Sequence, residues 1–372
     1  MKDALAEQLL AKVMGWNTAQ VTAELPILQD LARYKYDEYQ QFAPGERFIE
    51  SLALWLRQFQ TPAEREAAYQ FIRRRLVFCS AAEMRHLVES AFPCAIRPRI
   101  LQLAAEAEGL PTFQVKAIAQ TLSYRTLLRR TLFLGLSDGA RTDAFRRANP
   151  AISNEQIWHA YDYSESKAGE LGKKLIKDLT KLLGREPTSE EAKFRLVCLI
   201  DDFTASGRTY LRENDAGDGF DGKVATIFER LRNPGSSLAP FLDLAQLEAL
   251  IVIYVAASQA VTHLETELPK LARSGEQIAL KVVHSLPPQL RLGTGDAAIL
   301  ELAANDQYFD PQANTAATAV GGSDARMGFA DGRLPFVLSH NTPNNSLYLL
   351  WAEPWHNVRG LFPRVSRHRN FG

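Results

Sequence analysis

Two adjacent carboxylates, Asp201 and Asp202, stand directly after an apolar run in the middle of the chain. The run extends from Leu196 to Ile200 without a polar residue. An uninterrupted apolar run of this length is typical of a strand that is buried on both faces of a sheet. Because ligands of open α/β sheets bind where such strands end, we expect the two carboxylates to lie at a binding site.

A loop of small residues follows the acidic pair. It contains Thr204, Ala205, Ser206, Gly207, Arg208 and Thr209. A small-residue loop that opens a helix directs backbone N–H groups toward an anion, and the helix dipole adds to the attraction. Carboxylates suit the hydroxyl groups of a sugar attached to that anion, or a divalent cation. The segment therefore predicts a site for a sugar phosphate with a free diol; the alternative is a buried strand that ends in aspartates and a generic turn.

This segment resembles the 5-phosphoribosyl diphosphate (PRPP) signature of type I phosphoribosyltransferases. The signature has two apolar residues, Asp-Asp, three further residues, Thr or Ser, Gly, any residue and Thr. The matching positions are Asp201, Asp202, Ser206, Gly207 and Thr209. The resemblance implies that the acidic pair holds the ribose 2- and 3-hydroxyls and that residues 204–209 bind the 5-phosphate. Arg208 occupies the variable position, and its guanidinium is a candidate to pair with phosphate. The resemblance also implies Mg²⁺ as a cofactor, with Asp201 and Asp202 as candidate ligands.

A second loop follows an earlier apolar run, Thr131 to Leu136. It contains Ser137, Asp138, Gly139, Ala140 and Arg141. The family carries a diphosphate-binding loop after an earlier strand, so the resemblance implies phosphate contacts for Ser137, Asp138 and Gly139. It implies that Arg141 stabilises the leaving diphosphate. The Gly-rich diphosphate loop of the usual metabolic enzymes is missing, so the substrate is PRPP itself or another ribose-phosphate compound.

The C-terminal third carries an unusual turn, His340-Asn-Thr-Pro-Asn-Asn345. Asn and His side chains offer donors and acceptors without net charge, so His340, Asn341, Asn344 and Asn345 are candidates for a hood that recognises a base. A turn held by Asn and Pro chemistry alone is the alternative. Residues 130–372 resemble the divergent phosphoribosyltransferase-like family of bacterial anti-phage and conflict loci, including retron cassettes.

The elements that must position these loops divide the chain near residue 125. Residues 1–125 have helical periodicity, predict an all-α domain, and carry no recognisable phosphate loop or metal spacing, so we expect a docking domain. Residues 126–372 alternate strand runs with helical stretches, which predicts an α/β parallel-sheet domain, phosphoribosyltransferase-like and ending in the hood. Further strands are expected at 249–256, 277–283, 334–338 and 346–351, and helix over 153–183.

Composition excludes several other classes of protein. A chain of 372 residues with 46% hydrophobic and 23% charged residues is globular rather than disordered. Its 43 Lys and Arg balance 43 Asp and Glu, which gives no overall attraction to nucleic acid or to an anionic membrane. Three cysteines argue against a disulfide framework and a thiolate zinc site. No apolar run spans a membrane and no signal peptide is recognisable, so we expect a cytoplasmic protein.

Two functions are compatible with these features. An enzyme would transfer or hydrolyse the ribosyl group of PRPP or a related nucleotide, as a phosphoribosyltransferase-like glycosyltransferase or nucleosidase. The resemblance implies the toxic effector of an anti-phage, retron-type system, with a reverse transcriptase and its nucleic acid as partners. The alternative is a nucleotide-sensing module without turnover in a regulatory nucleoprotein complex, because a fold does not determine a function.

Overall fold

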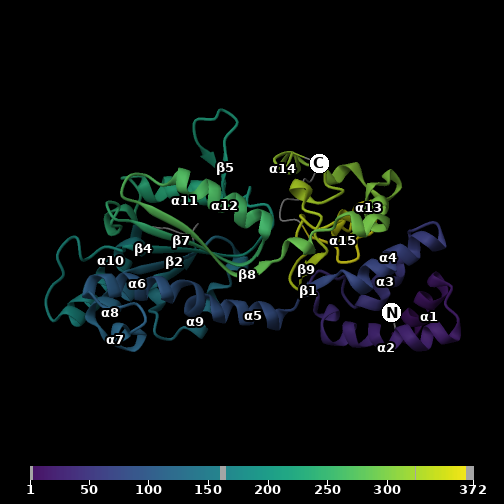
Figure 1. The fold of residues 1–372 in the computed structure, drawn as a ribbon, viewed down its shortest axis with the longest axis horizontal. Helices are drawn as coiled ribbons and strands as arrows, with labels where there is room; N and C mark the ends of the chain where they lie inside the picture. Colours follow the sequence, from purple (N-terminus) through teal and green to yellow (C-terminus); the bar gives the residue numbers. More distant parts are fainter. Residues whose placement is uncertain (1–2, 160–164, 323, 366–372) are drawn as a thin grey trace. The chain divides into compact units, whose positions relative to one another are not determined.

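The computed structural model describes residues 3–159, 165–322 and 324–365, which form two compact units (Figure 1). The first unit combines Met1–Met84 with Pro287–Gly372, and the second is Arg85–Leu286. This division differs from the expected boundary at residue 125. Residues 85–125 belong with the sheet, and the C-terminal segment belongs with the N-terminal helices.

A five-stranded sheet forms the centre of the second unit, and all its neighbouring strands are parallel. The strand order is β3-β2-β4-β7-β8. Their bounds are Thr131–Gly135 for β2, Ile157–His159 for β3, Leu196–Thr204 for β4, Glu248–Ala257 for β7 and Gln277–Leu286 for β8. The sequence predicted four of these strands, including the central β4. Because the order reverses between β2 and β4, a ligand crevice is expected at the carboxyl ends of these two strands.

Helices cover both faces of this sheet, as Figure 1 shows. Helices α10 (Glu165–Leu183), α11 (Lys223–Arg232) and α12 (Ser258–Leu271) share one apolar core with alternate strand residues such as Leu199 and Ile251. Strands that are covered on both sides need apolar residues at every position. This is why the sequence shows continuous apolar runs here instead of an alternating pattern.

The opposite face is covered by segments that precede or follow β2. Phe133 of β2 contacts Phe92, which lies in the π-helical turn Ala91–Ile96, and Phe145, which lies in α9 (Thr142–Ala148). Arg99 of α6 (Arg97–Glu108) donates from Nη2 to Glu248 Oε2 at the start of β7, at 2.8 Å. The other helices between residue 85 and β2 are the second part of α5 (Ala81–Ser90), α7 (Val115–Gln120) and α8 (Leu122–Arg129). Residues 85–125 therefore supply part of the sheet's own core.

The first unit is assembled from both ends of the chain. Its N-terminal helices are α1 (Asp3–Met14), α2 (Thr18–Tyr34), α3 (Phe48–Arg57) and α4 (Pro62–Arg74); its C-terminal helices are α13 (Ala297–Ala304), α14 (Ala316–Ala319) and α15 (Tyr348–Trp351). Strand β1 (Val77–Cys79) pairs in parallel with β9 (Phe336–Leu338). The strand at 334–338 was predicted in position, whereas β1 lies in a region that was expected to be entirely helical.

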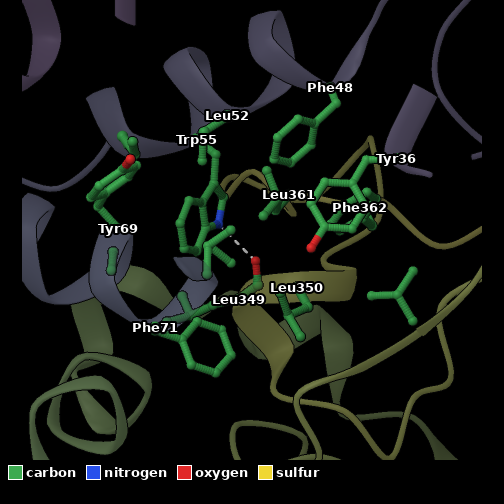
Figure 2. Close-up of a cluster of buried hydrophobic side chains, with 14 of the residues drawn as sticks. Tyr36, Phe48, Leu52, Trp55, Tyr69, Phe71, Leu349, Leu350, Leu361 and Phe362 are labelled. Atoms are coloured by element: carbon green, nitrogen blue, oxygen red, sulfur yellow. Dashed lines mark hydrogen bonds between the residues drawn. The ribbon is translucent and has the colours of Figure 1, made fainter. Parts of the chain in front are cut away.

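Aromatic side chains from the two ends meet in the core of this unit (Figure 2). Trp55 of α3 is fully buried, and its Nε1 donates to the carbonyl oxygen of Leu349 at 2.7 Å. Phe48, also of α3, stacks on Phe362 with 5.8 Å between the ring centroids. Because each pair joins residues about 300 positions apart, this core forms only when both ends of the chain are present.

Two expected elements differ in the structure. The run Ser346 to Trp351, expected as a strand, contains the short helix α15, and Trp351 Nε1 donates to the Ser346 carbonyl oxygen at 2.9 Å. A short apolar run that is buried on all sides does not distinguish helix from strand. The segment 153–183, expected as helix, contains the edge strand β3 (Ile157–His159), and α10 covers Glu165–Leu183. None of the helices in the described residues combines the length and the apolar character needed to cross a membrane.

The aromatic core gives a first prediction. Trp55→Ala should lower the free energy of unfolding by about 3–5 kcal/mol, because it leaves a cavity and removes the donor to Leu349. Urea unfolding followed by circular dichroism measures this change. Trp355→Phe is the matched control, since Trp355 is 46% exposed and its replacement should have little effect. Equal unfolding curves for Trp55→Ala and wild type would contradict this account of the core.

Candidate functional site

The carboxyl ends of β2 and β4 lie side by side where the strand order reverses. Gly135, the last residue of β2, is paired with Ile200, whereas β4 continues beside β7 as far as Thr204. The loop after β2 therefore faces the last four residues of β4. These are the two segments that the sequence predicted to share a site.

Two contacts join the loop after β2 to the acidic pair. The Ser137 hydroxyl donates a hydrogen bond to the Asp201 carboxylate. Gly139 lies against the Asp202 carboxylate so closely that a Cβ at this position would overlap it. The structure thus brings Ser137 and Gly139 together with Asp201 and Asp202, and any side chain at residue 139 would require the Asp202 carboxylate to move.

The two carboxylates of the pair occupy opposite faces of the sheet. Both belong to the extended part of β4, and side chains alternate along a strand. Asp201 is 0% exposed and also accepts from the Tyr210 hydroxyl at 2.7 Å and from Lys223 Nζ at 2.8 Å. Asp202 is half-buried on the side of Gly139 and accepts from the backbone N–H of Phe203 at 2.8 Å. The two carboxylates therefore do not act as a single site, because one is fully buried and the other is half-buried.

Burial raises the pKa of the Asp201 carboxyl, and the neighbouring charge of Asp202 raises this pKa further. The ammonium of Lys223 and the hydroxyl of Ser137 oppose both effects. Burial, followed by the charges of Asp201 and Asp202, also raises the pKa of the Tyr210 hydroxyl, which therefore remains a donor. An ionised Asp201 thus depends on Lys223, because a buried charge without a partner is costly.

The loop at residues 204–209 is shaped by its own hydroxyls. Gly207 adopts a φ of +75°, and its N–H donates to Thr204 Oγ1 at 3.2 Å. The N–H of Arg208 donates to Ser206 Oγ at 3.4 Å. Ala205 is buried, whereas Arg208 and Thr209 are exposed. The loop therefore presents Arg208 and Thr209 outward, and phosphate binding by these residues stays a prediction.

The expectation that this loop opens directly into a helix is wrong. Residues 207–211 make one turn, and a hairpin of β5 (Arg212–Glu213) and β6 (Phe220–Asp221) follows before α11 begins at Lys223. Backbone bonds nevertheless continue the helical pattern across the hairpin, from Lys223 N to Thr209 O at 3.1 Å and from Val224 N to Tyr210 O at 2.9 Å. The hairpin is thus an insertion within the first turn of the helix.

Gly222 makes this insertion possible. Its φ is +115°, and a Cβ would lie 2.5 Å from the Tyr210 carbonyl oxygen. The close approach brings Lys223 next to the turn that carries Tyr210, so both side chains reach Asp201. Sequence reasoning missed Lys223 because the hairpin separates it from the motif by more than ten residues. Tyr210 follows the motif directly and could have been found as the first apolar residue after it.

The loop after β2 has a second anchor that sequence reasoning missed. The Tyr254 hydroxyl of β7 donates to the carbonyl oxygen of Ala140 at 2.7 Å. Ser137 Oγ accepts from the Gly139 N–H at 3.1 Å, which closes the short 3₁₀ turn Asp138–Ala140, and Arg141 follows with a φ of +47°. The loop is therefore fixed from β4 and from β7, and Asp138 is its exposed residue.

The residues expected to form a hood belong to the first unit. Within it, Asn341 Nδ2 donates to the Val365 carbonyl oxygen at 3.3 Å and Asn345 Nδ2 to that of Phe329 at 3.0 Å. The backbone carbonyl oxygens of His340 and Asn344 accept from Gln41 Nε2 and from the Phe329 N–H. These bonds are what a turn held by Asn chemistry requires, and base recognition by these residues stays a prediction.

The donor set at Asp201 does not fit a metal ion. Its carboxylate already binds an ammonium group and two hydroxyls. In the part of the chain that the structure describes, no group of three or more His, Cys, Asp or Glu side chains could hold a metal.

A cavity of about 520 Å³ in this unit lies at the other end of the strands, where Glu248 and Gln277 begin β7 and β8.

Comparison with known proteins identifies the family. The family model described as PRTase-CE matches residues 52–364, which is more than half of the chain and includes parts of both units. The chain therefore belongs to this phosphoribosyltransferase-like family. No curated protein and no solved structure matches the chain significantly.

The dependence of Asp201 on Lys223 gives a second prediction. Lys223→Met should lower the free energy of unfolding by about 1–3 kcal/mol near pH 8, because a buried carboxylate loses its cation. Removing the ammonium raises the pKa of Asp201 further, so protonation at lower pH relieves the loss. The deficit relative to wild type should therefore shrink as pH falls.

Urea unfolding at several pH values measures this dependence. Lys270→Met is the control, since Lys270 has a similar exposure but pairs with the exposed Glu213 and the partly buried Glu267 instead of a fully buried carboxylate, and a smaller change is expected at any pH. A deficit for Lys223→Met that does not vary with pH would show that Asp201 is not the group that responds.

Proposed function

We propose that this member of the PRTase-CE family binds PRPP or a related ribose phosphate at the carboxyl ends of β2 and β4, and transfers or hydrolyses its ribosyl group. The observation that carries the proposal is the contact between the loop after β2 and the acidic pair of the PRPP-like segment. Two phosphate-type loops that face each other across an acidic pair suit a sugar that bears a phosphate group on either side.

Each loop has a role in this reaction. Residues 204–209 would hold the 5-phosphate through backbone N–H groups and hydroxyls, with Arg208 at the rim. The residues that follow β2, with Arg141, would bind the departing diphosphate. The bond between ribosyl C1 and the diphosphate oxygen breaks, the diphosphate keeps the electron pair, and the acceptor or water forms the new bond to C1. Such a reaction depends on positioning and on stabilising the charge of the leaving group.

Magnesium remains part of the proposal only as an ion that arrives with the substrate. Mg²⁺ is commonly held by one or two carboxylates together with substrate phosphates. Asp202 is the half-buried member of the pair, whereas Asp201 is fully buried. When bound, the ion would neutralise charge on the diphosphate.

A nucleotide-sensing module is the second candidate. The ammonium of Lys223 already neutralises the Asp201 carboxylate, so fewer charged groups remain to act on a substrate. This favours a module that binds a nucleotide without turnover. In either case we propose a cytoplasmic protein with protein and nucleic-acid partners, such as a reverse transcriptase in an anti-phage, retron-type system. The first unit carries none of the PRPP-like loops and is the proposed docking part.

Asp201→Asn combined with Asp202→Asn should abolish binding of ribose 5-phosphate, which gives a third prediction. Neutral amides lose the charge-assisted bonds, each worth about 1.5–3 kcal/mol. Calorimetric titration of the wild type and the double variant measures this effect. Asp215→Asn makes the same substitution at an exposed residue of the hairpin tip, outside the proposed site, and should leave the affinity unchanged. Unchanged affinity in the double variant would place the site elsewhere.

Incubation of the full chain with PRPP and Mg²⁺ separates the two candidates. An enzyme releases diphosphate, which a coupled assay detects, and the double variant should release none. A sensing module binds PRPP without releasing diphosphate. Absence of both binding and release would overturn the proposed function.

A further inference from the structure

We propose that α10 carries a nucleic-acid-binding surface, on which a row of three lysines, Lys173, Lys177 and Lys181, contacts backbone phosphates. This inference goes beyond the proposed function, because the row lies outside the two loops of the ribose-phosphate site. It also places a nucleic-acid contact on the second unit, whereas the proposed docking part is the first unit.

The spacing of the three lysines places them on one face of the helix. They stand at every fourth residue of α10, and side chains four positions apart in an α-helix lie above one another on the same face. All three are exposed. A rise of about 1.5 Å per residue makes the row about 12 Å long, which matches roughly three to four phosphates along one strand of a duplex.

The protein's own carboxylates leave this row positively charged. Within the described ranges, none of the three ammonium groups takes part in an ion pair, whereas the neighbouring Lys174 pairs with Glu155 at 2.5 Å. Asp178, which stands between two lysines of the row, accepts from Arg129 Nε of α8 at 2.8 Å. Like charges one turn apart repel each other and destabilise a helix. A polyanion bound along the row would remove this repulsion.

The segment that packs against α10 adds positive charge and no negative charge. Helix α8 contacts α10, and the chain contains neither Asp nor Glu from Gly109 to Ser137. Arg125 is exposed and lies one turn before Arg129, on the side of α8 that faces α10. The lysine row is therefore flanked by further cationic surface, in a chain whose positive and negative charges balance overall.

The burial of the apolar face of α10 argues against a membrane as the anionic partner. A helix that lies on a membrane inserts its apolar face into the lipid. In α10 this face, with Leu171, Leu175 and Leu179, is fully buried in the core of the sheet. Only the charged face is left to meet a partner.

The choice of lysine favours nucleic acid over an acidic protein. Lysine is depleted in interfaces between proteins, where aromatic residues and arginine are enriched. A flexible ammonium group binds a phosphate as a point charge, and contacts of this kind hold a nucleic-acid backbone without reading its sequence. The partner chemistry is therefore a phosphodiester backbone, and sequence preference is not expected from this surface.

Removing the three charges tests the surface. Lys173→Gln combined with Lys177→Gln and Lys181→Gln keeps good helix formers at exposed positions, so the fold should persist, which circular dichroism checks. Fluorescence anisotropy of the full chain with a labelled single-stranded RNA and with a DNA duplex measures affinity over a range of salt concentrations. The slope of log affinity against log salt should fall by about 2 for the RNA and about 3 for the duplex. Affinity at about 0.1 M salt should fall about tenfold or more.

A control variant removes the same charge from other exposed positions, through Lys12→Gln, Lys270→Gln and Lys281→Gln. Its slope should stay close to that of wild type. Equal slopes for wild type and the α10 variant would overturn the proposal, and so would equal losses in the two triple variants. Wild type that binds phosphatidylserine vesicles or polyglutamate more tightly than either nucleic acid would overturn it as well.

Binding of ribose 5-phosphate separates this inference from the proposed function. The α10 variant should bind ribose 5-phosphate like wild type, and a loss would place the lysines in that site and overturn their assignment to nucleic acid. If wild type binds RNA through α10 but does not bind ribose 5-phosphate, the proposed function falls and this surface stands. If it binds ribose 5-phosphate but neither nucleic acid, only this surface falls.

Discussion

The buried carboxylate of Asp201 organises the site on which the functional argument depends. A charge that is removed from water must be matched by donors, and here each donor comes from a different segment of the chain. The requirement to satisfy one carboxylate thereby brings the end of β2, the turn after β4 and the start of α11 to one place. Since Lys223 supplies the opposing charge, the hairpin between residues 211 and 223 matters for the site although it lies outside the sheet.

The parallel sheet explains why two such different carboxylates stand next to each other in sequence. Strand β4 continues past the end of β2, so that Asp201 and Asp202 are still part of an extended strand and alternate between its faces. One face is closed by α11, and the other meets the short turn that contains Gly139. On a flexible loop, two adjacent aspartates would have similar burial. Their difference in burial follows from the length of the strand.

The sequence predicted the features that depend on local patterns. Strands such as β4 and β7 are buried on both faces and therefore appear as continuous apolar runs, and the motif residues at the end of β4 are contiguous. It did not predict features that depend on distant segments. The core around Trp55 and Phe362 joins the two ends of the chain, and no local pattern signals that pairing. Likewise, Lys223 reaches Asp201 only because Gly222 permits a close approach to Tyr210, and the three-residue strand β3 is too short for a recognisable alternation.

A crystal structure of the full chain with ribose 5-phosphate would test the account most directly. The account predicts the phosphate group within hydrogen-bond distance of the loop at residues 206–209, and the 2- and 3-hydroxyls within hydrogen-bond distance of the acidic pair. It also predicts that Asp201 keeps its bonds to Ser137, Tyr210 and Lys223. A ligand whose diol lies on Asp201 with Lys223 displaced, or a ligand bound away from the carboxyl ends of β2 and β4, would contradict it.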